Sequence, residues 1–118
     1  MNGLVELFDG ENKHVLRFGY PACMEFEVRC FPKDRKISPN LGKINVDLIY
    51  SGLLGEAVRN DKPIPEYGVA YDLHDAVAEQ SDYSDQIQRV WDTYHASKWG
   101  ADFKARMEEF SKKKAQGK

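Results

Sequence analysis

The sequence lacks most of the features that indicate a particular chemistry. It contains two cysteines, Cys23 and Cys30, which lie seven residues apart and have no CxxC spacing. That spacing within one element disfavours a disulfide between them, so we expect two small buried thiols in a reducing cytosol. No stretch approaches the roughly 20 apolar residues that span a bilayer, and no apolar segment follows Met1 as it would in a signal peptide.

Motifs for nucleotide binding and for nucleophilic catalysis are also missing. The chain has no GxGxxG sequence, no P-loop and no GxSxG elbow. The histidines His14, His74 and His95 share no i,i+4 spacing with a cysteine or with each other, whereas a zinc site needs about four converging ligands. We therefore expect no metal site, no cofactor and no catalytic residue.

The chain has little net charge but distributes it unevenly. The net charge of −2 argues against a general nucleic-acid binder. Residues 61–110 carry 11 acids and 5 bases, whereas residues 111–118 carry 4 lysines and no acid. Four lysines attract a polyanion only weakly. The segment 111–118 also lacks an apolar anchor, so we predict a basic tail that frays or is disordered.

The residues that are present predict an α+β fold in a single domain, residues 1–110. A chain of 118 residues supports one hydrophobic core. Two β-prone runs, LVELF and KHVLRF, flank a turn signal at 9–12 and predict a β-hairpin over 4–18. A helical body of about four helices is expected to follow, over 21–110.

The stretch 41–58 predicts a central helix. Its apolar residues cover most of the helix circumference, which is typical of a helix buried between other elements. Gly52 and Gly55 each cost about 1 kcal/mol relative to alanine inside a helix. We expect that their function is to let a neighbouring element pack closely.

Residues 22–31 carry two competing periodicities. Apolar residues at every second position from Met24 to Cys30 alternate with charged residues, which is the periodicity of a strand. Glu25 and Arg29, by contrast, are spaced as a helical i,i+4 ion pair. The residue pattern leaves both structures open and slightly favours a strand.

Two further helices are predicted at 66–80 and 85–110. Gly100 lies where the apolar stripe of the second one changes register, so we expect a kink there or a break into two helices. In the predicted helix at 66–80, the residues expected to point toward the core are Val69, Leu73, Ala76 and Val77.

An acidic face is predicted on the helix at 66–80. Asp72, Asp75 and Glu79 lie on one side of it, close in sequence to His74. Such a cluster could bind a cation or take part in acid–base chemistry. A solvated acidic face is the commoner explanation, and we adopt it.

Aromatic residues of the last predicted helix form the candidate functional surface. Such residues are enriched at the centres of protein interfaces. Trp91 and Tyr94 also suit the core of a small domain, whereas the positions from Trp99 onward lie beyond the compact body and suit contact with a partner. The candidate partner-binding residues are Trp91, Tyr94, Trp99, Phe103, Met107 and Phe110.

The order of these elements resembles that of the tail assembly chaperones of long-tailed phages and prophages. In that family a hairpin and a Phe-Gly step, here Phe18-Gly19, lead into a helix with an apolar and acidic pattern, here at 24–27. The sequence DLIYSGLL at 47–54 is similar to the family's Leu-Ile-Tyr-Ala-Gly-Leu pattern, and Val69–Val77 stands in place of its valine and leucine run. The resemblance favours a helix at 22–31, which we adopt.

The resemblance implies a non-enzymatic protein of the bacterial host cytoplasm. Such a protein binds the long helical tape measure protein, keeps it soluble and helps to recruit tail tube subunits. An apolar helical surface can accept a partner helix, acids limit aggregation, and a homo-oligomer with open, head-to-tail contacts could line a long partner. Two alternatives stay open: a small structural virion protein of the head–tail connector or tail-completion type, and a small ligand-binding or enzymatic domain.

Overall fold

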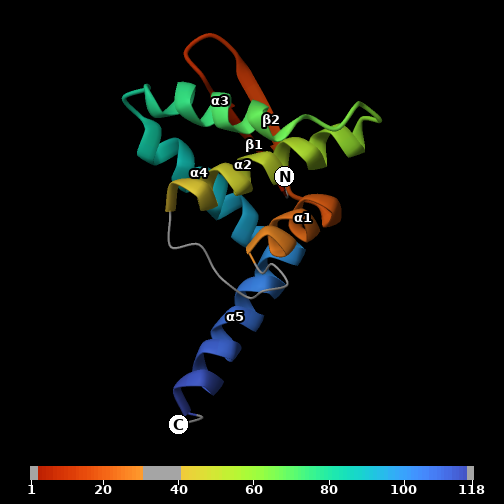
Figure 1. Cartoon of the computed structure of the whole chain (residues 1–118), viewed down its shortest axis with the longest axis vertical. Coiled ribbons are helices and arrows are strands. Elements are labelled where there is room, and N and C mark those ends of the chain that lie inside the picture. The colour runs from red at the N-terminus through yellow and green to blue at the C-terminus, as the bar shows by residue number, and fades with distance from the viewer. Residues whose placement is uncertain (1–2, 31–40, 117–118) are drawn as a thin grey trace.

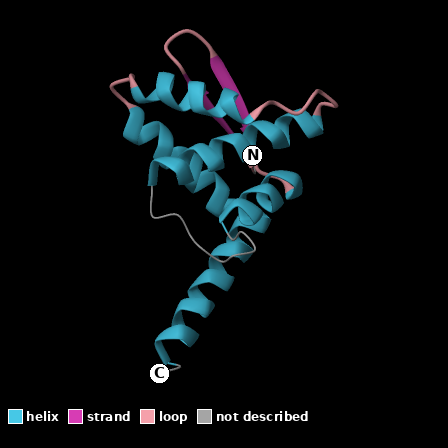
Figure 2. Ribbon diagram, viewed as in Figure 1, coloured by secondary structure: helices cyan, strands magenta, loops and turns pink. Residues whose placement is uncertain are grey.

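The fold is a β-hairpin followed by five helices, in a computed structural model that describes residues 3–30 and 41–116. The predicted α+β class is confirmed, with five helices where about four were expected (Figures 1 and 2). Among the described residues, no helix is both long enough and apolar enough to cross a membrane. The elements are β1 (Leu4–Phe8), β2 (Lys13–Arg17), α1 (Tyr20–Cys30), α2 (Leu41–Arg59), α3 (Tyr67–Ala78), α4 (Tyr83–Ala96) and α5 (Lys98–Gln116).

The hairpin has one face on the core and one face open. β1 and β2 pair antiparallel, with Val5 opposite Leu16 and Leu7 opposite His14. Leu7 and Leu16 are completely buried. Because successive side chains of a strand point to opposite faces, the alternate residues of both strands point away from the core. The predicted hairpin over 4–18 is therefore confirmed.

The segment after the hairpin is a helix, as adopted from the resemblance, and not a strand. In α1 the buried side chains are Ala22, Cys23 and Phe26, which recur with helical spacing. Met24 and Val28, which a strand would have buried with Phe26, are exposed. The alternation of apolar residues therefore does not mark one buried face: Phe26 lies on the buried side of α1, and Met24 and Val28 lie on its exposed side.

α2 is the central helix of the molecule, as predicted. Every residue from 46 to 52 is buried, so the helix is covered on all sides along two turns. α1, β2, α3 and α4 all contact it. The core therefore lies around α2 and not on one side of it.

Two glycines let α2 approach β2 closely. A Cβ atom on Gly52 would lie 2.6 Å from the Cβ of Leu16. A Cβ atom on Gly55 would overlap the carbonyl oxygen of Arg17 and lie 2.9 Å from the Cβ of Ala22. The expectation that these glycines permit close packing is confirmed, with β2 and α1 as the neighbours.

α3 turns a different face to the core than the sequence pattern predicted. Ala70, Leu73 and Val77 are buried, with spacings of three and four residues. Val69, which we expected to point inward, is about half exposed. Ala70 is buried in its place, because Ala70, Leu73 and Val77 lie on the same side of the helix. Val69 is the preceding residue, so its side chain points about 100° away from that of Ala70.

The predicted break in the C-terminal helix occurs at Ser97 and not at Gly100. Ser97 has an extended backbone, its N–H donates to the carbonyls of Thr93 and Tyr94, and its Oγ accepts the N–H of Gly100 at 3.1 Å. Ser97 thus ends α4 and caps α5. Gly100 is still needed, because a Cβ there would overlap the carbonyl oxygen of Tyr94.

α5 extends away from the body of the molecule (Figure 1). Its described side chains after Phe103 are all exposed. The helix continues to Gln116, so the backbone of 111–116 is helical, past the predicted end at 110. Fraying of that stretch in solution stays a prediction, and residues 117–118 lie outside the described part of the chain.

Alanine at either central glycine should destabilise the fold. We expect Gly52→Ala and Gly55→Ala to lower the free energy of unfolding by about 1–3 kcal/mol each, because the added methyl overfills a packed contact. Gly68→Ala in α3 is the matched control, since nothing lies within 4 Å of its added Cβ. It should be neutral or raise the free energy by up to about 1 kcal/mol. Urea unfolding followed by circular dichroism measures all three, and equal effects at 52, 55 and 68 would contradict the close approach.

Candidate functional site

The aromatic residues of α4 belong to the core. Tyr94 is 1% exposed, and its ring lies edge-on to Phe18 and Phe26, with centroids 5.8 and 5.1 Å away. Trp91 is half-buried, 5.7 Å from the ring of Phe26, and its Nε1–H donates to Oδ1 of Asn45 at 2.9 Å. These two residues join α4 to α1 and α2 and present little surface to a partner.

The aromatic residues of α5 divide between core and surface. Phe103 is half-buried and lies 6.4 Å from the ring of Phe26. Trp99 is exposed and meets the ring of Tyr20 edge-on at 5.0 Å. The side chains of Met107 and Phe110 lie outside the described residues, so their predicted role stays a prediction.

Trp99 is part of an exposed apolar surface that sequence analysis missed. The outer face of α1 carries three exposed apolar side chains at i, i+4 and i+8. Together with Trp99 they form what we call the α1–α5 patch, whose members are 38% to 60% exposed. The helical spacing of three of them was the available signal, but the alternation of 24–30 obscured it. The patch consists of Tyr20, Met24, Val28 and Trp99.

A small pocket lies inside the α1–α5 patch. It has a volume of about 190 Å³ and is lined by Tyr20, Cys23, Met24, Glu27, Trp99 and Arg106. Arg106 and Glu27 form a bidentate ion pair at its rim, with both N–O distances 2.9 Å. Burial raises the pKa of the Cys23 thiol. The thiolate is therefore disfavoured, and Cys23 contributes a small apolar floor instead of a nucleophile.

A second open surface, which we call the hairpin groove, lies on the outer face of β1 and β2. Its volume is about 680 Å³. Lys13 and Arg89 of α4 border an apolar floor, and Glu6 is the acid among the lining residues. The apolar lining consists of Leu4, Phe8 and Val15 of the outer face, together with Val5, which lies opposite Leu16 and packs against the core.

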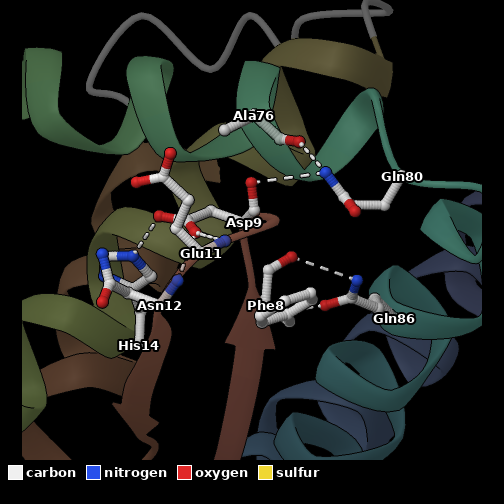
Figure 3. A network of polar contacts seen from close by, with 8 residues as sticks. All are labelled: Phe8, Asp9, Glu11, Asn12, His14, Ala76, Gln80 and Gln86. Atoms are coloured by element: carbon white, nitrogen blue, oxygen red, sulfur yellow. Dashed lines mark hydrogen bonds and ion pairs between the residues drawn. The ribbon is translucent and has the colours of Figure 1, made fainter.

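A buried glutamine fixes the edge of the hairpin beside this groove. Gln86 of α4 is completely buried. Its Oε1 accepts the N–H of Phe8 at 2.8 Å, and its Nε2 donates to the carbonyl of Phe8 at 3.2 Å (Figure 3). The side-chain amide thus replaces a neighbouring strand, so β1 has no free edge at this point.

The turn of the hairpin is held by Asp9 and docks on α3. Oδ1 of Asp9 accepts the N–H groups of Glu11 and Asn12 at 2.8 and 2.7 Å, and Oδ2 lies 2.8 Å from Nε2 of His14 (Figure 3). Nε2 of Gln80 donates to the carbonyl of Asp9 at 3.3 Å. The hydrogen bonds from Asn12, His14 and Glu11 lower the pKa of Asp9 to about 2.

A buried carboxylate lies where α1, α2 and α3 meet. Asp47 pairs with Lys43 at 2.9 Å and accepts the hydroxyl of Tyr67. Burial and this hydrogen bond raise the pKa of Tyr67. The guanidinium of Arg29 lies over the rings of Tyr50 and Tyr67, 4.6 and 4.7 Å from their centroids. Each of these polar groups has a partner, which suits a structural role for the cluster.

The acidic face of α3 is open to solvent. Asp72, Asp75 and Glu79 are exposed. Nε2 of His74 lies 2.7 Å from the hydroxyl of Tyr83, and its Nδ1 lies 3.9 Å from Oδ1 of Asp75. Within residues 3–30 and 41–116, no group of three His, Cys, Asp or Glu side chains could hold a metal ion. The acids therefore do not converge on one point.

Comparisons with models of protein families, with curated proteins and with solved structures found no match to this chain.

The Asp9 carboxylate should contribute stability that depends on pH. Because its pKa is lowered from 3.8 to about 2, this contribution is complete above about pH 4 and is lost as the pH falls toward 2. Asp9→Asn keeps an acceptor for the turn but carries no charge, so its melting temperature should fall less steeply over this range. Thermal unfolding between about pH 5 and 2 measures the difference. Glu11→Gln removes an exposed carboxylate of the same turn and should keep the steep slope of the unchanged protein; equal slopes for all three proteins would contradict the assignment.

Proposed function

We propose that this protein is a non-enzymatic tail assembly chaperone of a long-tailed phage or prophage. In this role it binds the tape measure protein in the cytoplasm of the bacterial host and helps to recruit tail tube subunits. Two observations support the proposal: the sequence resemblance to that family and the α1–α5 patch. The patch is the observation that carries it, because a binding protein needs exposed apolar surface that its own core leaves uncovered.

The chemistry of the α1–α5 patch suits an apolar helix. Tyr20, Met24 and Val28 form a stripe about 12 Å long on one face of α1, which is the contact length of two helical turns. Trp99 widens the stripe, and aromatic residues and methionine are enriched in such contacts. A second helix can pack along this stripe, as amphipathic helices do in apolar grooves.

The pocket within the patch gives the partner helix a place for one anchoring side chain. Its 190 Å³ suits a single large apolar side chain that packs against Tyr20, Met24 and Trp99 of the lining. The ion pair of Arg106 with Glu27 keeps charge at the rim and away from the floor. The acids elsewhere on the surface, concentrated in 61–110, would keep the loaded complex dispersed.

Substitutions in the patch should weaken partner binding without unfolding the protein. The partner for the test is a coiled-coil fragment of the tape measure protein, whose long helical reading frame we expect directly downstream of this gene. The unchanged chaperone should keep the co-expressed fragment soluble and co-elute with it. Met24→Glu and Trp99→Ala should each weaken the complex about tenfold or more, because truncated aromatic anchors and buried charges are costly at an interface.

Ile64→Glu is the matched control, since Ile64 is an exposed apolar residue outside the patch. It should bind like the unchanged protein. If the fragment stays insoluble with every protein, or if Ile64→Glu is as damaging as Met24→Glu, the proposed function is wrong. Mass spectrometry of purified virions separates a chaperone, which is absent from the mature particle, from a structural virion protein, which remains in it.

A further inference from the structure

We propose that a pocket at the junction of β2, α1 and α2 binds the C-terminal carboxylate of a partner polypeptide whose last residue is apolar. We call it the arginine pocket, because Arg17 and Arg59 both line it. The proposal goes beyond the proposed function and does not depend on it, since the arginine pocket shares no residue with the α1–α5 patch or with the pocket inside that patch.

The arginine pocket forms where three elements meet. Arg17 ends β2, Gly19 and Pro21 lie at the start of α1, and Arg59 ends α2. Its volume is about 490 Å³, within the range of roughly 300–1,000 Å³ that is typical of ligand sites. Gly55, which also belongs to the lining, packs against the carbonyl of Arg17. The close contact between α2 and β2 therefore fixes the position of two walls of the pocket.

The two arginines supply donors for an anion. Nε of Arg17 donates to Oε1 of Glu56 at 2.9 Å, which orients the guanidinium and occupies one of its five N–H groups. Arg59 is exposed, and its side chain has no ion pair or hydrogen bond within residues 3–30 and 41–116. The lining contains no acid, and Glu56 together with the two arginines gives a net charge of +1. A guanidinium binds a carboxylate through two parallel hydrogen bonds, so both arginines suit this ligand.

The rest of the lining is apolar side chain and bare backbone. Phe18, Pro21 and Val58 supply the apolar side chains, and Val58 is 45% exposed. At Gly19 the backbone is open, because a Cβ there would approach no atom beyond the neighbouring residues more closely than Cδ of Pro21, at 4.0 Å. Another chain can approach the backbone closely at such a glycine. The pocket thus places cations beside apolar side chains and accessible main chain.

A polypeptide C-terminus that ends in an apolar residue carries the matching groups on a single carbon atom. Its last Cα bears both a carboxylate and an apolar side chain, so the two enter one pocket together. Inorganic phosphate has no apolar group to place against Phe18 and Val58. A carboxylate on an aspartate or glutamate side chain likewise brings no apolar group on the same carbon. Capture of a C-terminal carboxylate is a recurring mode of peptide recognition.

Titration of the isotope-labelled full chain with short peptides, followed by NMR spectroscopy, tests the proposal. The probe is a hexapeptide of glycine and serine that ends in leucine with a free carboxylate. It should shift the amide signals of Gly19 and Gly55, which report on the pocket. The same peptide with an amidated C-terminus should bind about tenfold or more weakly, because it has lost the charge and one acceptor oxygen.

Substitution of the arginines tests the site from the side of the protein. Arg59→Gln should weaken binding of the leucine peptide about tenfold or more and should fold normally, because Arg59 is exposed at the end of α2. Arg59→Lys keeps the charge without the planar fork and should give an intermediate affinity. Arg17→Gln should also weaken binding, and circular dichroism checks that this variant folds without its ion pair to Glu56.

Arg89→Gln is the matched control for these variants. Arg89 is an exposed arginine of α4 that, like Arg59, lacks an ion pair within the described part of the chain. It lines the hairpin groove and not the arginine pocket. The variant loses the same charge at a different place and should bind the leucine peptide as the unchanged protein does.

Two further ligands distinguish the source of the carboxylate. An amidated peptide with aspartate in the last position presents a side-chain carboxylate, and inorganic phosphate presents an anion without an apolar group. Both should shift the signals of Gly19 and Gly55 only at concentrations about tenfold or more above those of the leucine peptide. Equal binding of either ligand would contradict recognition of a C-terminus.

Three other results would overturn the proposal: unshifted signals of Gly19 and Gly55 at saturating leucine peptide, equal binding of its amidated form, or equal losses in Arg59→Gln and Arg89→Gln. The outcome is separate from that of the proposed function, because none of these measurements uses the tape measure fragment. If the α1–α5 patch binds that fragment, Arg59→Gln should still keep it soluble. Failure of the peptide to bind leaves the proposed function standing, and failure of the fragment to bind leaves the arginine pocket standing.

Discussion

The close contact between α2 and β2 determines where the other elements can lie. Gly52 and Gly55 bring the helix backbone against Leu16 and Arg17, and Gly55 also admits Ala22 of α1. A helix that is apolar all round needs cover on every side. With β2 and α1 on one side, α3 and α4 fill the rest, and the complete burial of residues 46–52 is the result.

The hairpin depends on this arrangement as much as the helices do. Two strands alone are at best marginally stable, so the hairpin needs a packed face and protected edges. α2 covers its inner face, and the amide of Gln86 occupies part of the edge of β1. Asp9 and Gln80 then attach the turn to the end of α3. The outer face stays partly open, and the hairpin groove lies there.

Local sequence signals predicted the elements better than they predicted the faces of those elements. The turn at 9–12 and the apolar content of 41–58 indicated the hairpin and the central helix, because turn chemistry and overall hydrophobicity are local properties. Which side of a helix is buried depends on its neighbours. Val69 was assigned to the core from the apolar pattern of the helix, yet Ala70 is buried in its place and Val69 is about half exposed.

The same limit affected the candidate functional surface. The break in the last helix was foreseen from Gly100, but it occurs at Ser97, whose buried hydroxyl caps α5 and contributes nothing to the apolar periodicity that was used. Tyr94 and Trp91 were ambiguous between core and interface, and only the position of Phe26 places them in the core. Met24 and Val28 could not be recognised as a surface stripe while a strand at 24–30 remained open.

The distribution of apolar residues explains why apolar side chains remain exposed on α1 and α3. The aromatic side chains of α4 fill the space between α1 and α2, so the core is complete without the outer side of α1. Single exposed apolar residues are normal on any protein and require no explanation. Three at helical spacing on α1, joined by Trp99, and two that flank an acidic stripe on α3 are ordered sets beyond what the core uses. Exposing such sets adds nothing to the stability of the monomer, and this is the physical basis on which a binding role of the α1–α5 patch is proposed.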